Sequence, residues 1–179
     1  MLKTLLILPL LFAPACSGPA STEPIPSGVQ ELGIPNLVAV DARLFSSGQP
    51  SPAHLAALSA GGVQHVIQLR PATETGSGWE EQRTAELGLG FTRIPIAGND
   101  DMTEENARRL DRALAEAQAA EGRLVLLSCA SGNRCGGLLA LRAFYCQGAT
   151  PKDALALGKR AGMTRTEPAV RRLLGLTEE

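Results

Sequence analysis

The sequence predicts one α/β domain with a mainly parallel central sheet flanked by helices in three layers. Apolar runs of strand length alternate with helical segments, and capping or breaking residues mark the changes between them. Hydrophobic residues make up 44% of the 179 residues, which is enough for a full core. The formal net charge of −1 argues against a general nucleic-acid binder.

The boundary residues set the order of the elements. Ser51 and Thr103 are expected N-caps, Pro52 opens its helix, Gly61 stops that helix, and the helix from Thr103 is expected to end near Gly122. The expected strands are 37–39, 43–46, 63–69, 91–94 and 124–127. The expected helices are 51–59, 79–87, 103–122, 135–147, 150–161 and 167–174.

A six-residue loop from Cys129 to Arg134 joins the strand at 124–127 to the helix at 135–147. The free amides of such a loop and of the first helical turn point at one spot and favour an anion there. A thiol at that spot is favoured as thiolate by the helix and by a nearby guanidinium. Arg134 offers a planar fork of donors for a tetrahedral oxyanion.

The loop therefore predicts a nucleophile in an oxyanion-binding cradle. Asn133 is expected to support the loop backbone by tolerating a tight conformation. The expected phosphate-binding residues are Ala130, Ser131, Gly132, Asn133, Arg134 and Cys135.

Cys129…Arg134 resembles the active-site loop of the cysteine-dependent phosphatases and of the rhodaneses. The arginine stands five places after the cysteine, which is similar to a rhodanese loop, whereas tyrosine and dual-specificity phosphatases use six. The segments 45–51 and 62–71, followed by Glu74, resemble the phosphatase-like domain of beta-lactamase-hydrolase-like proteins, which also has five-place spacing. This resemblance implies a Cys-based phosphatase-like fold.

The resemblance implies a phosphatase that forms a phospho-cysteine on Cys129 and needs no cofactor. It also implies an aspartate general acid about 30 residues earlier, and Asp100 and Asp101 stand 29 and 28 residues before Cys129. Ser128 replaces the usual histidine, which removes a charge but leaves a hydroxyl that can hydrogen-bond. No Cys/His cluster has metal-ligand spacing, so no metal site is expected.

Two other functions remain open. The same thiolate can take sulfur from a donor and become a persulfide, as in a rhodanese-like sulfurtransferase, and that reaction needs no aspartate acid. The loop can also serve a non-catalytic module that only binds anions. The expected partner is a phosphorylated small molecule or protein, and no nucleic acid.

The N-terminus predicts export. Residues 1–15 read as a signal peptide, 16–36 as a flexible tether and 37–179 as the phosphatase-like domain. Cys16 follows a small residue, as in bacterial lipoprotein signals, so lipidation would provide the only membrane attachment. The expected location is the bacterial periplasm, either as a membrane-anchored lipoprotein or as a soluble exported protein.

Cys135 is a candidate redox partner. Cys129 and Cys135 stand at the two ends of the loop, and an oxidising compartment favours a disulfide from a low-pKa thiolate. We therefore expect that Cys135 can trap Cys129 reversibly. Thiol titration of the non-reduced protein tests this expectation, and two free, reactive thiols with full activity would contradict it.

Overall fold

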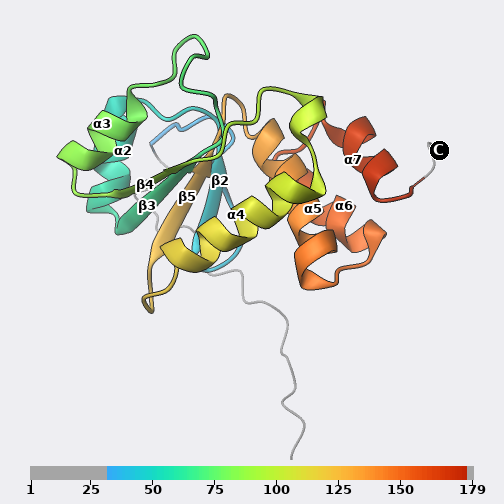
Figure 1. Cartoon of the computed structure of the whole chain (residues 1–179). Coiled ribbons are helices and arrows are strands. Elements are labelled where there is room, and N and C mark those ends of the chain that lie inside the picture. Colours follow the sequence, from blue (N-terminus) through green and yellow to red (C-terminus); the bar gives the residue numbers. More distant parts are fainter. Residues whose placement is uncertain (1–31, 177–179) are drawn as a thin grey trace, which may run out of the picture.

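The computed structural model describes residues 32–176 and contains one five-stranded sheet (Figure 1). The predicted signal peptide, Cys16 and most of the tether lie outside the described residues. The strand order is β1-β2-β5-β3-β4, with β1 antiparallel to β2 and every other pair parallel. The strands are β1 (Val38–Ala39), β2 (Leu44–Ser47), β3 (Val63–Gln68), β4 (Gly90–Arg93) and β5 (Leu124–Ser128). The predicted fold class is confirmed.

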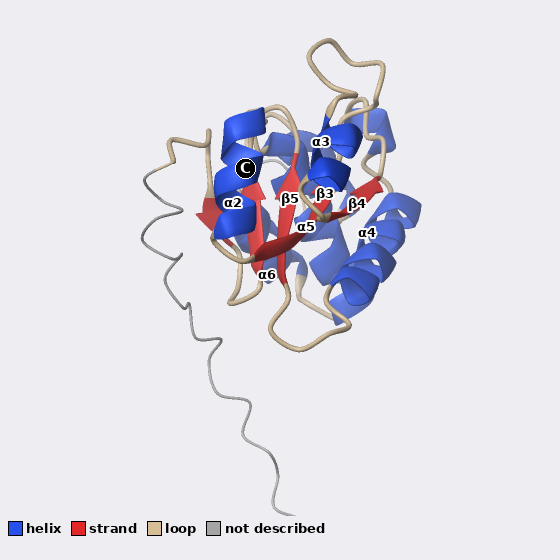
Figure 2. Cartoon of the chain, turned by 90° about the vertical axis from the view of Figure 1, so that its left-hand side faces the viewer, coloured by secondary structure: helices blue, strands red, loops and turns tan. Residues whose placement is uncertain are grey.

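Helices cover both faces of this sheet (Figure 2). On one face lie α2 (Pro52–Ala60) and α3 (Glu80–Glu86). On the other face lie α4 (Glu104–Ala117), α5 (Asn133–Gln147), α6 (Pro151–Arg160) and α7 (Glu167–Leu173). A short 3₁₀ turn, η1 (Asn99–Asp101), precedes α4.

The central position of β5 in the sheet explains why the sequence of this strand is continuously apolar. Val125 and Leu127 belong to the core that the strands form with α4 to α7, whereas Leu126 belongs to the core with α2. All three side chains are fully buried. A strand covered on both faces has no solvent side, so the apolar run carries no alternation.

The folded domain begins earlier than residue 37. Ile34, assigned to the tether by the sequence, is only 6% exposed and packs in the core beside α2. The carbonyl oxygen of Pro35 accepts a hydrogen bond of 2.7 Å from the Gly48 amide. The proline- and glycine-rich composition hid this segment, because the burial of Ile34 depends on strands far along the chain.

Two helix boundaries also differ from expectation. α4 ends at Ala117 instead of near Gly122, and Ala117 is the last buried residue of that helix. α5 begins at Asn133 instead of Cys135, so two residues of the predicted loop form its first turn. Within residues 32–176, no helix has both the length and the apolar character needed to span a bilayer.

Gly136 lets α5 approach both α6 and the segment after it closely. A Cβ built on Gly136 would lie 2.4 Å from the Met163 amide nitrogen and 2.5 Å from the Gly158 carbonyl oxygen. Because both neighbours are backbone atoms, we expect Gly136→Ala to lower the free energy of unfolding by about 1–3 kcal/mol. Urea unfolding measures this change. Gly98→Ala is the control, since a Cβ on Gly98 meets nothing within 4 Å, and equal stabilities of the two variants would contradict the prediction.

Candidate active site

The Cys129 loop lies at the carboxyl end of the central strand. β5 ends at Ser128, and α5 follows after Gly132, its N-cap residue. Gly132 has φ of 79°, a left-handed conformation that favours glycine. The residue that tolerates the tight turn is therefore Gly132, and the expectation that Asn133 does so was wrong, because Asn133 is already helical.

Cys129 is held as a thiolate. The Gly132 amide donates to its Sγ at 3.1 Å, and the side chain is buried. A hydrogen bond from the Cys135 thiol, opposed by burial and aided by the amides of Cys135 and Ser131 and the charge of Arg134, lowers the pKa of Cys129 to about 5. The cradle thus supplies a nucleophile that is ionised at neutral pH.

Cys135 stays a neutral thiol beneath the loop. Burial, followed by its contact with Cys129, raises the pKa of Cys135 well above the usual range. Its Sγ also lies 3.7 Å from the carbonyl oxygens of Ser47 and Leu127. The hydroxyl of Ser128, expected to help in place of histidine, is buried without a hydrogen-bond partner among the described residues. Neither Cys129 nor Cys135 forms a disulfide here, and the redox trap stays a prediction.

The ionisation of Cys129 can be measured by ultraviolet difference titration of thiolate against Cys129→Ser. We expect a midpoint near pH 5, with kcat/KM rising as pH increases through the same value. Cys135→Ala should move the midpoint upward, since it removes the main stabilising hydrogen bond. Cys146→Ala should leave it unchanged. A midpoint near 9 in the unmodified protein would contradict the assignment.

The lowered pKa of Cys129 also makes the stability of the fold depend on pH. The pKa of Cys129 is about 5 in the folded state and 9.0 in a free thiol. Ionisation therefore stabilises the fold fully above the free-thiol pKa, and this contribution is lost as pH falls through the folded pKa. Cys129→Ser should lack this part of the pH dependence of unfolding.

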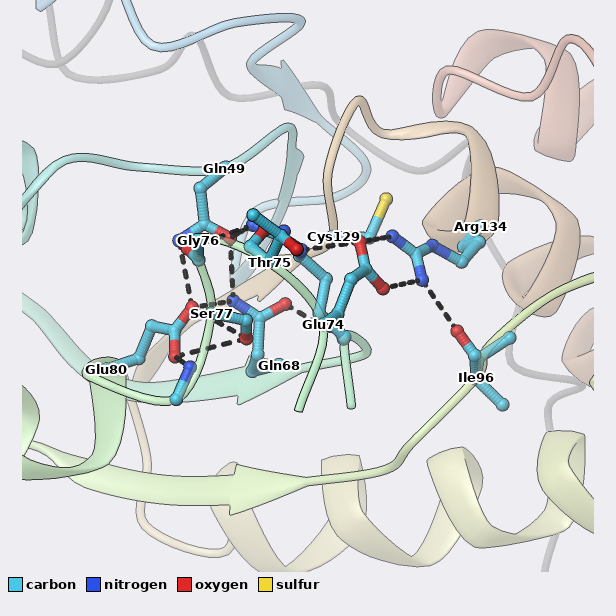
Figure 3. Close-up of polar contacts among 12 residues, drawn as sticks. Gln49, Gln68, Glu74, Thr75, Gly76, Ser77, Glu80, Ile96, Cys129 and Arg134 are labelled. Carbon is cyan, nitrogen blue, oxygen red and sulfur yellow. Dashed lines mark hydrogen bonds and ion pairs between the residues drawn. The ribbon is translucent and has the colours of Figure 1, made fainter. Parts of the chain in front are cut away.

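Arg134 is fixed by Glu74 in a two-bond ion pair (Figure 3). Its Nη1 donates to Oε2 at 2.7 Å and its Nη2 to Oε1 at 2.9 Å, while Nη1 also donates to the Ile96 carbonyl oxygen at 2.7 Å. Hydrogen bonds from Arg134 and, against burial, from Arg70 hold the pKa of Glu74 at about 2. Glu74 is thus charged whenever Cys129 is a thiolate.

A polar network that runs from Arg70 to Glu80 holds Glu74 in place (Figure 3). Arg70 donates through Nε to Glu74 at 2.8 Å and through Nη1 to the Gln49 side chain at 2.7 Å. Gln49 and Gln68 in turn donate to Glu80, which also pairs with Arg93 at 3.0 Å. The positioning role of Glu74 escaped the sequence reasoning, although Gln49, Arg70 and Glu74 all lie in the segments that carry the family resemblance.

Residues before β1 and residues directly after β2 contact the Cys129 loop and hold it in place. Asn36 has φ of 52°, and its side-chain amide donates to the Ser131 carbonyl oxygen at 2.9 Å. The Gln49 amide donates to the Ala130 carbonyl oxygen at 3.2 Å. Gly48 fits between Pro35 and Ala130, where a Cβ would lie 3.0 to 3.1 Å from their atoms. Segments 60 or more residues away in sequence therefore set the shape of the cradle.

A cavity of about 420 Å³ opens beside Arg134. Three walls form it: the Cys129 loop with Glu74, the segment before η1, and the segment before α7. Its lining residues are Glu74, Ala97, Gly98, Asn99, Ala130, Ser131, Asn133, Arg134, Arg165 and Thr166. Within the described residues, no group of three or more His, Cys, Asp or Glu side chains is placed to hold a metal ion.

Known proteins resemble this chain in sequence and in fold. No protein-family model matches the sequence. Over 109 residues, the chain is 30% identical to the beta-lactamase hydrolase-like proteins of two Xylella fastidiosa strains, covering 59% of this chain and 24% of each relative. The sequence resemblance is thus confirmed, and the chain spans about a quarter of the length of these relatives.

Solved structures extend the likeness to nearly the whole domain. A DUF442 protein assigned as a phosphatase, from Shewanella putrefaciens, is 19% identical with a TM-score of 0.63, covering 83% of this chain and 95% of that one. Pseudomonas aeruginosa TpbA in complex with phosphotyrosine is 17% identical with a TM-score of 0.61, covering 89% and 98%. The chain has the fold of the cysteine-dependent phosphatases.

The predicted acids of this cysteine-phosphatase fold lie in η1, next to the cavity. The segment contributes Ala97, Gly98 and Asn99 to the cavity wall, whereas Asp100 and Asp101 follow directly after. Asp101 accepts a hydrogen bond of 2.6 Å from the Ala97 amide, and Asp100 is exposed. The structure thus does not bring either carboxylate to the cavity wall, and the acid assignment stays a prediction.

Replacing Glu74 tests whether its ion pair with Arg134 is needed to orient that arginine in the Cys129 loop. Glu74→Gln keeps the size of the side chain but removes the charge that orients Arg134. We expect kcat/KM for a phosphomonoester to fall by about 100-fold, because small displacements of a positioning group have effects of this size. Glu86→Gln, which breaks an exposed ion pair with Arg83, is the control and should have no effect. Equal activity of both variants would show that Arg134 needs no such partner.

Proposed function

We propose that the protein is a cysteine-dependent phosphatase that hydrolyses phosphomonoesters through a phospho-cysteine. One observation supports this most directly: a thiolate and a clamped arginine meet at a helix N-terminus beside a cavity. The amides of the loop and Arg134 can together bind three phosphoryl oxygens. The cysteine-phosphatase fold agrees with this chemistry.

The reaction follows from these groups. The Cys129 sulfur attacks phosphorus, and the bond from phosphorus to the leaving oxygen breaks. Asp100 or Asp101 protonates that oxygen after η1 moves toward the cavity. Water then attacks the phospho-cysteine and gives a proton back to that aspartate, the bond from phosphorus to sulfur breaks, inorganic phosphate leaves and the thiolate is restored. Because Cys129 is 0% exposed, the loop must open slightly around the phosphoryl group as it binds.

Mass spectrometry of the intact reduced protein tests this proposal. The protein is incubated briefly with para-nitrophenyl phosphate or, in parallel, with thiosulfate. A phosphate adduct on Cys129 that is absent from Cys129→Ser is the expected result. A sulfur adduct without a phosphate adduct would instead indicate a sulfurtransferase, and neither adduct nor turnover would indicate an anion-binding module. TpbA was solved with phosphotyrosine, so an aryl phosphate is a suitable first substrate.

We also propose that the protein is exported and anchored through a lipid on Cys16. The support is the pattern of residues 1–16, with an apolar core after Lys3 and small residues before Cys16. Fatty-acid labelling in a bacterial host should mark the protein and not Cys16→Ser. Labelling of neither, with the protein in the periplasmic fraction, would favour the soluble exported form.

A further inference from the structure

A second cavity adjoins the catalytic cavity. Ser131 and Arg165 line both of them, so they form a shared wall. The second cavity has a volume of about 400 Å³, and Asn36, Val38 and Thr164 also line it. The space beside the proposed phosphoryl site is therefore large enough for another part of a small-molecule substrate.

The backbone of Arg165 is held firmly in this wall. The side-chain oxygen of Asn133 accepts hydrogen bonds from the amides of Thr164 at 2.8 Å and Thr166 at 3.1 Å. The Thr166 hydroxyl also donates to the Asn133 carbonyl oxygen at 3.2 Å. Because Asn133 is in the first turn of α5, the two residues that flank Arg165 are tied directly to the catalytic loop.

The charge of Arg165 is not used by the rest of the fold. Its side chain is exposed, and no hydrogen bond or ion pair within residues 32–176 involves its guanidinium group. The other cation of the catalytic cavity, Arg134, is matched by Glu74. Arg165 thus carries a surplus positive charge on a firmly held backbone between two cavities, and such a group favours an anion.

We propose that Arg165 binds a second anionic group of the substrate, so that the protein prefers small phosphomonoesters that carry another phosphate or carboxylate. This inference rests on the proposed function, because it places the reacting phosphoryl group at Arg134. The second anion then lies at Arg165, and the body of the substrate crosses Ser131 toward the second cavity. Two adjoining hollows of this size suit a small molecule better than the flat surface of a folded protein does.

Binding to the full chain that carries Cys129→Ser tests this inference without turnover. Titration calorimetry compares glucose 1,6-bisphosphate with glucose 6-phosphate. We expect the bisphosphate to bind about tenfold more tightly, as one additional charge-assisted contact implies. Adding Arg165→Gln should reduce the affinity ratio to near one. Adding Arg172→Gln, which removes an exposed charge that lines neither cavity, should preserve the ratio.

The outcomes separate this inference from the proposed function. Equal affinity for the two sugars, no measurable binding of the bisphosphate, or a ratio that survives Arg165→Gln would each overturn the role of Arg165. A preference that disappears with Arg165→Gln supports it, even if no phospho-cysteine forms in the unmodified protein. In that case only the proposed reaction would fail.

Discussion

Replacing Cys129 with serine should lower kcat for para-nitrophenyl phosphate by at least about 10⁴-fold, since the nucleophile itself is removed. The serine hydroxyl does not ionise in the range where the thiolate forms, so the hydrogen bonds that hold the pKa of Cys129 at about 5 cannot activate it. Steady-state kinetics at neutral pH measures the loss. Circular dichroism should show the same secondary structure for both proteins.

Cys146→Ser is the matched control for this loss. Cys146 lies on α5 like Cys135, but it is partly exposed and lines neither cavity. Its replacement should leave kcat within about twofold, as for most surface changes. If Cys129→Ser retained a tenth of the activity, the nucleophile would have to be another group.

Replacing Arg134 with lysine should lower kcat/KM by about 10³-fold, although the positive charge is kept. An ammonium group cannot make two parallel bonds to Glu74 and a further pair to phosphoryl oxygens, as a guanidinium fork can. The loss of one such donor in an oxyanion site costs two to three orders of magnitude in other enzymes. The same kinetic assay measures this effect.

Arg142→Lys provides the comparison, because Arg142 also lies on α5 and pairs with a carboxylate, Asp111, at 2.9 Å. It lines neither cavity, so its replacement should be nearly silent. Similar losses of kcat/KM in the two variants would indicate general damage to α5 and would contradict a specific need for the guanidinium group of Arg134.

Local signals were sufficient to predict most of the fold. The apolar run before Cys129 and the caps Ser51 and Thr103 depend on their immediate neighbours, and the strand and the two helix starts that they predict appear where they were expected. The exceptions are segments whose structure depends on distant partners. Ile34 looked like part of a tether because nothing near it in sequence shows that it packs beside α2.

The site divides in the same way. Cys129 and Arg134 were found because their spacing follows from one loop. The ion pair between Glu74 and Arg134 joins residues 60 positions apart, and the anchoring of Thr164 by Asn133 joins residues 31 apart. Such pairs depend on how the helices and strands pack in three dimensions, and no local pattern of charge or hydrophobicity specifies them.

The bond from Asn36 to Ser131 sets a limit on how far the chain can be shortened. A recombinant protein cut back to Val38 would keep every strand and helix that the structure describes within residues 32–176, and by those criteria it would look complete. It would lack both the Asn36 side chain and the Pro35 carbonyl that meets Gly48. Its catalytic loop would lose these contacts, so even a truncated protein that folds would give a misleading measurement of activity.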